Sequence, residues 1–140
     1  MANTTNTERF FWDGHRGAYH LNLSSDGTAL SDLNLIDLSA DLDPAPAAIK
    51  IRTIQCTMYG NFILTLEIDA TTDIAFITIE NQTADVSYEF VRDFTDFPNG
   101  GWGVGTTNKA AAGFTGDLVA TSSTIASGDG FDLVVTFEKD

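Results

Sequence analysis

The sequence predicts an all-β fold: an antiparallel β-sandwich, jelly-roll-like, with about eight or nine short strands. Short runs in which apolar and polar residues alternate recur along most of the chain. Clusters of Gly, Asn, Asp and Ser separate these runs about every ten residues, as turns do. No stretch carries a convincing helical period, so short strands joined by turns remain, which is typical of sandwiches and barrels.

The N-terminal part divides into a polar tail and the first strands. Residues 1–8 are polar, which predicts a flexible N-terminal arm, and residues 9–140 are expected to form a single β-sandwich domain. Strands are predicted over residues 9–12 and 17–23, on either side of the turn at Asp13-Gly14. Residues 30–42 are best interpreted as a strand followed by a loop, with one helical turn around 38–42 as the open alternative.

The middle of the chain contains the clearest strand signals. Residues 48–58 form one apolar run whose parity changes after Ile51, which predicts a β-bulge near Arg52 or Thr53. Residues 62–69 alternate again after the turn at 59–61. We therefore expect these two segments to pair as a hairpin.

The last part of the chain predicts four more strands and the longest loop. The strands cover residues 74–79, 86–91, 116–122 and 130–138, and the loop covers residues 92–109, which contain four glycines and a proline. In the final strand, one face carries Phe131, Leu133, Val135 and Phe137. This face is the expected contribution of the strand to the core.

Composition and charge exclude several classes of partner. The chain has 140 residues, 43% of them hydrophobic and 19% charged, which fits one globular domain. A formal net charge of −13 repels phosphate, so we expect no nucleic acid and no anionic membrane as partner, whereas a basic protein surface would be attracted. The sequence shows no secretory signal and no apolar run long enough to span a membrane, so we expect a soluble protein.

The reactive residue types are too few for most catalytic or metal sites. One cysteine, Cys56, and two histidines exclude an internal disulfide, a zinc site and most nucleophile–base pairs. Carboxylates and an amide gather at residues 37, 41 and 43 and at residues 93, 96 and 99, but neither group has the spacing of a calcium-binding EF-hand loop. We therefore expect no enzymatic activity, no cofactor and no bound metal.

Aromatic residues beside loops are the best interface candidates. Exposed aromatic side chains suit interface hot spots and sugar stacking, although they can equally fold back as a lid on the sandwich. Three consecutive aromatics cannot all point to one face of a strand, so at least one near the N-terminus should meet a loop or a partner. The candidates are Phe10, Phe11, Trp12, Phe94, Phe97 and Trp102.

Two segments resemble small structural proteins of tailed-bacteriophage virions. The first is the strand and turn at 64–73, which ends in I-D-A-T-T-D; the second comprises A-G-F-T-G-D-L at 112–118 and the closing run S-G-D-G-F at 127–131. Proteins of that group carry a W-D-A-T-T-D-like turn, an A-G-x-T-G-D-I segment and an S-G-D-x-Y strand that ends in a basic residue. The resemblance covers about the C-terminal half, and the chain departs from it at Ile68 and Phe131, where Trp and Tyr are commoner.

The resemblance implies a virion part. It is compatible with a head decoration protein and with a tail component. Our leading expectation is a capsid decoration (cement) protein that is made in the host cytoplasm, binds the major capsid protein as a homotrimer and stabilises the capsid surface. The alternative is a carbohydrate-binding module of a tail fibre or receptor-binding protein, with the loop around Trp102 as its platform. An enzyme such as a glycoside hydrolase is the third reading, and no recognisable site motif supports it.

Overall fold

The computed structural model describes residues 3–81, 87–94, 102–103 and 111–139, and only the backbone of 102–103. Within these residues the chain forms ten strands and one helical turn, which follow one another as β1 (Thr4–Trp12), β2 (Arg16–Ser24), β3 (Leu33–Ile36), α1 (Leu38–Asp41), β4 (Ile49–Tyr59), β5 (Ile63–Ile68), β6 (Ile74–Glu80), β7 (Tyr88–Asp93), β8 (Trp102–Gly103), β9 (Leu118–Ser122) and β10 (Gly130–Lys139). The all-β prediction is confirmed.

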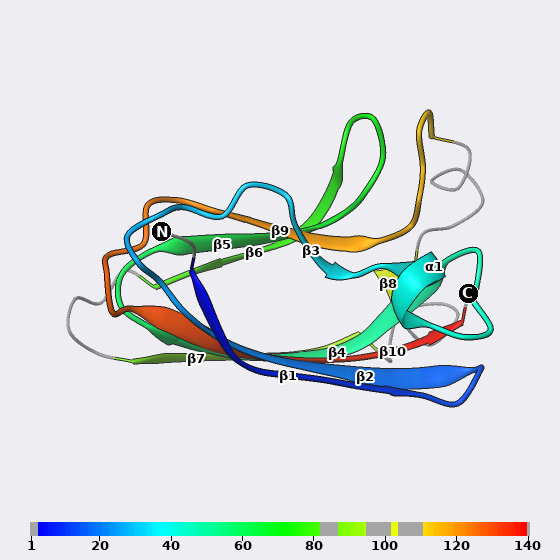
Figure 1. Ribbon diagram of the computed structural model, residues 1–140, viewed down its shortest axis with the longest axis horizontal. Coiled ribbons are helices and arrows are strands. Elements are labelled where there is room, and N and C mark those ends of the chain that lie inside the picture. Colours follow the sequence, from blue (N-terminus) through cyan, green and yellow to red (C-terminus); the bar gives the residue numbers. More distant parts are fainter. Residues whose placement is uncertain (1–2, 82–86, 95–101, 104–110, 140) are drawn as a thin grey trace.

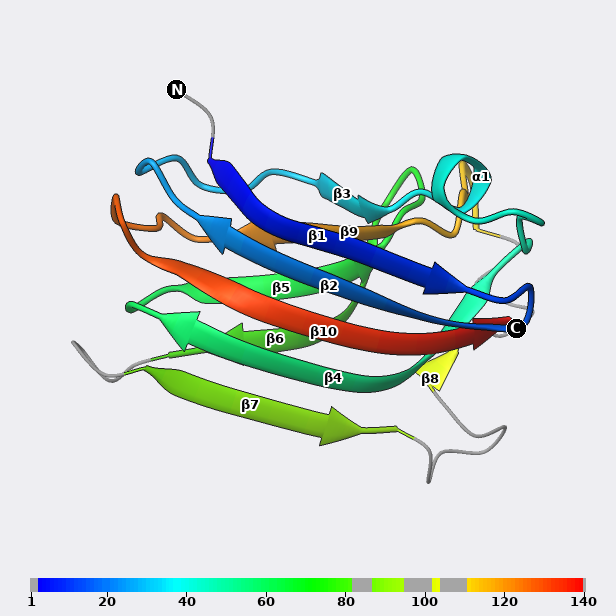
Figure 2. The same cartoon turned by 60° about the horizontal axis from the view of Figure 1, so that its bottom comes forward.

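The strands form two antiparallel sheets that face each other (Figure 1). Sheet A has the order β1-β2-β10-β4-β7, with the two-residue β8 also paired to β4, and sheet B has the order β3-β9-β5-β6. Figure 2 shows sheet A from outside, with its five long strands in this order. Apolar residues from both sheets fill the space between them in one continuous core.

The connections follow the jelly-roll pattern. Strands near the two ends of the chain pair with each other, and the strands between them pair in turn toward the middle of the sequence. The pairs are β2 with β10, β3 with β9, β4 with β7 and β5 with β6. Nested antiparallel pairs of this kind describe one long hairpin that is rolled up into two four-stranded sheets. The strand β1 adds an edge to sheet A beside β2.

The predicted hairpin between residues 48–58 and 62–69 is wrong. The first segment is β4 of sheet A and the second is β5 of sheet B, so the turn at Gly60 carries the chain from one sheet to the other. Gly60 has a φ of +116°, and its carbonyl accepts a hydrogen bond of 2.6 Å from the buried side chain of Asn81. A turn that reverses the chain does not require the strand after it to pair with the strand before it. Here β5 cannot pair with β4, because β10 and β7 already occupy the two edges of β4.

The bulge prediction is confirmed. Where β4 pairs with β10, Thr53 lies opposite Thr136 and Ile51 lies opposite Phe137, the next residue of β10. Arg52 is therefore the extra residue. Because of this insertion, residues of both parities along β4 point into the core: Ile49, Ile51, Ile54, Cys56 and Met58 are all buried. The helical turn that the sequence left open is also present, as α1.

The predicted flexible arm at residues 1–8 is a strand from Thr4 onward. Thr4–Trp12 pairs with β2 along its length, and Asn3 is tied down by hydrogen bonds to the carbonyl of Thr28 and from the backbone N–H of Asp26. The segment has few apolar residues because it lies at the edge of sheet A with most of its side chains exposed. Its polarity therefore reflects an edge position.

The segments that carry the phage resemblance contact each other in the fold. The backbone N–H of Asp69 donates to the carbonyl of Asp117, that of Thr71 donates to Ala112, and that of Thr115 donates back to Asp69. The Thr115 hydroxyl also donates to the Asp69 carboxylate over 2.6 Å. These hydrogen bonds tie the β5–β6 turn to the chain that enters β9.

Candidate functional site

The outward surface of sheet A, here called the A face, carries three of the exposed large apolar side chains of the described chain. Five large apolar residues of the described chain are exposed, and all of them lie on strands of this sheet: Phe10, Phe11, Tyr59, Tyr88 and Val91. The register places Phe11, Tyr59 and Val91 on the outward side. They lie on three separate strands, β1, β4 and β7, and make this face the candidate interaction surface.

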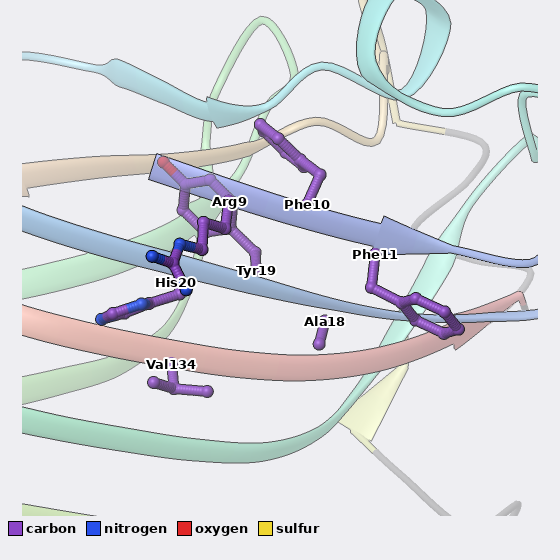
Figure 3. Close-up of a pocket in the computed structure, with 7 residues that line it drawn as sticks. All are labelled: Arg9, Phe10, Phe11, Ala18, Tyr19, His20 and Val134. Atoms are coloured by element: carbon purple, nitrogen blue, oxygen red, sulfur yellow. The ribbon is translucent and has the colours of Figure 1, made fainter. Parts of the chain in front are cut away.

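The two neighbouring phenylalanines point to opposite sides of β1 (Figure 3). Phe10 lies against the buried ring of Tyr19, with centroids 4.7 Å apart, and remains 38% exposed. Phe11 lies beside Ala18 on the A face and is 59% exposed. Of the predicted interface residues whose side chains the structure describes, Phe11 is thus the most exposed.

The other aromatic candidates have different positions. Trp12 is half-buried: its ring stacks on Phe137 at 5.8 Å and its Nε1–H donates to the carbonyl of Pro44. Phe94 is only 3% exposed and belongs to the core, with the guanidinium of Arg92 over its ring, so it is not a surface residue as predicted.

The Trp102 loop is only partly described. Phe97 lies outside the described residues. The backbone of Trp102 pairs with Ile51, and its side chain also lies outside the described part. The predicted sugar-binding platform therefore rests on residues that the structure does not describe.

A shallow depression of about 260 Å³ lies on the A face next to Phe11 (Figure 3). Ala18 lies between Phe11 on one side and Arg9 and His20 on the other, and Val134 lines the depression from the neighbouring strand β10. The ring of His20 pairs with the carboxylate of Asp132 at 2.6 Å. The depression is smaller than typical small-molecule pockets, so it suits one side chain of a partner better than a cofactor.

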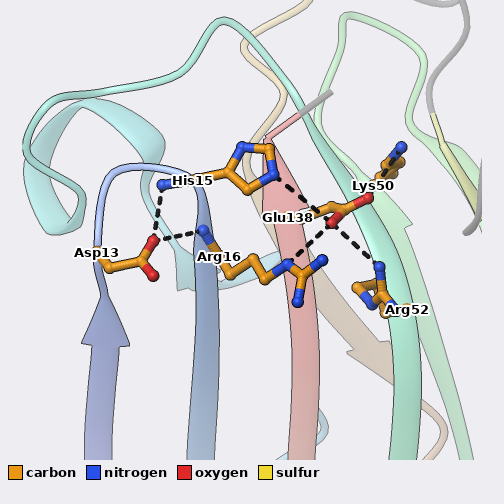
Figure 4. A network of polar contacts seen from close by, with 6 residues as sticks. All are labelled: Asp13, His15, Arg16, Lys50, Arg52 and Glu138. Atoms are coloured by element: carbon orange, nitrogen blue, oxygen red, sulfur yellow. Dashed lines mark hydrogen bonds and ion pairs between the residues drawn. The ribbon is translucent and has the colours of Figure 1, made fainter.

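A cluster of charges occupies one end of the A face (Figure 4). The carboxylate of Glu138 on β10 contacts Arg16 on β2 at 3.4 Å, and Lys50 and Arg52 on β4 at 2.9 and 3.1 Å. His15 lies 3.9 Å from the same carboxylate. Arg52 is the extra residue of the bulge, and its side chain reaches Glu138 beside that of Lys50.

The environment of Glu138 favours its charged form. Burial alone would raise the pKa of this carboxyl, but the hydrogen bonds and charges of Lys50 and Arg52 outweigh burial and hold the pKa below its usual value. The carboxylate therefore joins three neighbouring strands through ion pairs at neutral pH. No sequence motif predicts this, since residues 16, 50, 52 and 138 become neighbours only through strand pairing.

Carboxylates that could hold a cation lie elsewhere than the sequence suggested. Asp37 and Asp41 cap α1: Asp37 accepts from the backbone N–H groups of Ser39 and Ala40, and Asp41 accepts from that of Asp37. The Ser39 hydroxyl and the Ala40 N–H lower the pKa of Asp37. These two acids therefore have a structural role, and positions 96 and 99 of the second predicted group lie outside the described residues.

A different acidic group forms on the side of sheet B. Carboxylate oxygens of Asp32, Glu67 and Asp73 lie within 4.8 Å of one another, and burial together with the Asp32 carboxylate raises the pKa of Asp73. Oxygen ligands of this kind suit Ca²⁺. The three residues come from separate elements, so their spacing in the sequence carries no signal.

Comparisons of this chain with protein-family models, with curated proteins and with solved structures find no match. In the described residues, no helix is long and apolar enough to cross a membrane.

Proposed function

We propose that this chain is a structural protein of a tailed-bacteriophage virion, a capsid decoration (cement) protein that binds the shell of major capsid protein. The observation that carries the proposal is the A face: a flat sheet surface that carries three of the five exposed large apolar side chains of the described chain. A flat face suits a broad protein surface, whereas a small ligand needs a deep pocket. The resemblance of the turn motifs to phage structural proteins supplies the virion context.

The architecture supports a repeated, shape-based contact. Jelly rolls occur in viral capsid proteins and in lectins. A decoration protein needs only modest affinity per copy, because contacts repeated by symmetry on one particle add avidity. The homotrimer that the resemblance implies belongs to the same proposal and is measured by sedimentation equilibrium of the purified chain.

The test is a binding titration on particles from the source phage that lack the protein. We expect saturable binding, at a fixed number of copies per particle, and regular density on the head in electron cryomicroscopy. Binding restricted to tails or fibres would replace the decoration role by a receptor-binding role. Absence of binding to both heads and tails would refute the virion proposal.

A second candidate, the sugar-binding module, is favoured by one observation. The rings of Phe11 and Tyr59 are both exposed on the A face, and aromatic rings are the surfaces on which sugars stack. A glycan panel that quenches the intrinsic fluorescence of the wild type but not of Tyr59→Ala would favour this function. A wild type that responds to no glycan while it binds particles would exclude it.

A further inference from the structure

The Lys and Arg residues that the structure describes all lie on one sheet of this acidic protein. The chain has seven Lys and Arg residues and a net charge of −13. Lys109 lies outside the described residues, and the other six all lie on strands of sheet A: Arg9, Arg16, Lys50, Arg52, Arg92 and Lys139. The strands of sheet B that the structure describes carry acidic residues and no Lys or Arg.

Four of these cations belong to the A face itself. On the outward side of β1, β2, β10 and β4 the register places Arg9, Arg16 and Lys50, and Arg52 joins them through its contact with Glu138. The same four strands carry two acidic residues on this side, Asp132 and Glu138. The patch on these four strands is thus net positive, whereas β7, at the far edge of the sheet, adds Glu89 and Asp93 on the same side and the molecule as a whole is strongly negative.

Two of the four cations are accessible to a partner. Arg16 is 62% exposed although it contacts Glu138, and a guanidinium has more N–H donors than this single contact uses. Arg9 is exposed and makes no ion pair within the described residues. Arginine pairs well with carboxylates at interfaces, because its planar fork donates two parallel hydrogen bonds.

The depression between Arg9 and Phe11 adds an apolar contact to this charge. The depression can receive one apolar side chain over Ala18 and against Val134, with the Phe11 ring on one side and the Arg9 guanidinium on the other. A matching surface would present an apolar residue flanked by carboxylates. Nucleic acid matches less well, because its phosphates would be repelled by the remainder of a chain of charge −13.

We infer that the A face docks onto an acidic protein surface, with Arg9 and Arg16 pairing to its carboxylates and one of its apolar side chains seated over Ala18 and Val134 beside Phe11. The inference rests on the proposed function and deepens it, because it gives the decoration protein a docking face and its partner a charge. It also reverses the expectation from net charge alone, which favours a basic partner.

The first experiment measures binding of the full chain to particles that lack it. Arg9→Glu and Arg16→Glu are compared with Lys139→Glu, which makes the same charge change at an exposed position that the register places on the opposite side of the sheet. We expect each A-face variant to weaken binding roughly tenfold at low salt and to flatten its salt dependence, whereas Lys139→Glu stays near wild type. Phe11→Ser should lower the binding affinity about thirtyfold, as loss of an interface hot spot does. Tyr88→Ser, at the other edge of the sheet, is its control.

The outcomes separate the docking face from the proposed function. If the wild type and every A-face variant bind equally well, the decoration role stands and the docking face is wrong. If the wild type binds no particle, the decoration role is wrong, and the docking face is judged by a second experiment in cells that make the protein. There, a photo-crosslinking benzoylphenylalanine replaces Phe11 in one variant and Thr78, exposed on sheet B, in another.

The crosslinked segment decides the inference in that second experiment. Crosslinks from position 11 to a protein segment with more Asp and Glu than Lys and Arg support it. Crosslinks from position 78 alone, or from position 11 to a basic segment, to nucleic acid or to a second copy of this chain, overturn it. Crosslinks from neither position overturn it as well.

Discussion

Replacement of Glu138 by glutamine should destabilise the fold in a pH-dependent way. The change keeps the shape of the side chain but removes the charge that three cations share. Breaking a fully buried ion pair costs about 3–5 kcal/mol and breaking an exposed one at most about 1 kcal/mol. The Glu138 side chain is 9% exposed, whereas Lys50, Arg52 and Arg16 are 17%, 29% and 62% exposed, so we expect an intermediate loss of about 2 kcal/mol.

The pH dependence identifies charge as the cause. Because the pKa of Glu138 is lowered in the folded protein, its stabilisation is fully present above the pKa of an unfolded glutamate, about 4.3, and is lost as pH falls through the lower folded pKa. At pH 7 the variant should therefore unfold at about 1 M less urea than the wild type. Near pH 3 the difference should shrink, since the glutamate of the unfolded chain is then protonated and folding must release that proton to form the ion pairs.

The assay is urea unfolding followed by tryptophan fluorescence at both pH values. Glu89→Gln is the matched control, because Glu89 is exposed on the outward side of β7 and should change the free energy of unfolding by less than about 0.5 kcal/mol. Equal stability of Glu138→Gln and the wild type at pH 7 would refute the role of the cluster. A loss of the same size at pH 7 and pH 3 would refute the charge explanation in favour of altered packing.

Three further predictions use the same unfolding assay or a thiol reagent. Gly17→Ala places a Cβ 2.6 Å from the ring of Phe137, so it should lower the free energy of unfolding by about 1–3 kcal/mol. An unchanged urea midpoint would show that the core adjusts freely. Asn81→Ala removes the donor to the Gly60 carbonyl at the crossing between the sheets, so it should also lower the free energy of unfolding by about 1–3 kcal/mol. A loss below about 0.5 kcal/mol would contradict the view that this hydrogen bond holds the crossing in place. Cys56 is buried, and burial raises its pKa to about 12, so it should react with Ellman's reagent at pH 8 only as fast as the protein unfolds; rapid labelling of the native protein would contradict the structure.

The strands and their inward faces were predictable because they depend on local alternation. In the last strand, the predicted face of Phe131, Leu133, Val135 and Phe137 is the one that the structure buries. The bulge at Arg52 was predictable for the same reason, since a change of parity within one apolar run requires an extra residue if both halves are to face the core. Such patterns need only the two-residue period of a strand.

Strand partners were not predictable from these patterns. The turn at Gly60 has the composition of a hairpin turn, yet β4 pairs with β10, which follows it by some seventy residues, and not with β5. The edge strand from Thr4 was hidden for a related reason, because an edge strand with exposed side chains needs no apolar alternation. Both features depend on segments that are distant in the sequence.

The sequence by itself therefore determined the all-β class, most strand positions and the side chains that enter the core. Only the tertiary structure decided which sheet each strand joins, that Phe11 is presented while Phe94 is buried, and that the described cations share one sheet. The physical reason is that burial of alternate residues is a property of each strand alone, whereas a surface is assembled from neighbours. Arg9, Arg16, Lys50 and Arg52 become one patch because backbone hydrogen bonds place β1, β2, β10 and β4 side by side.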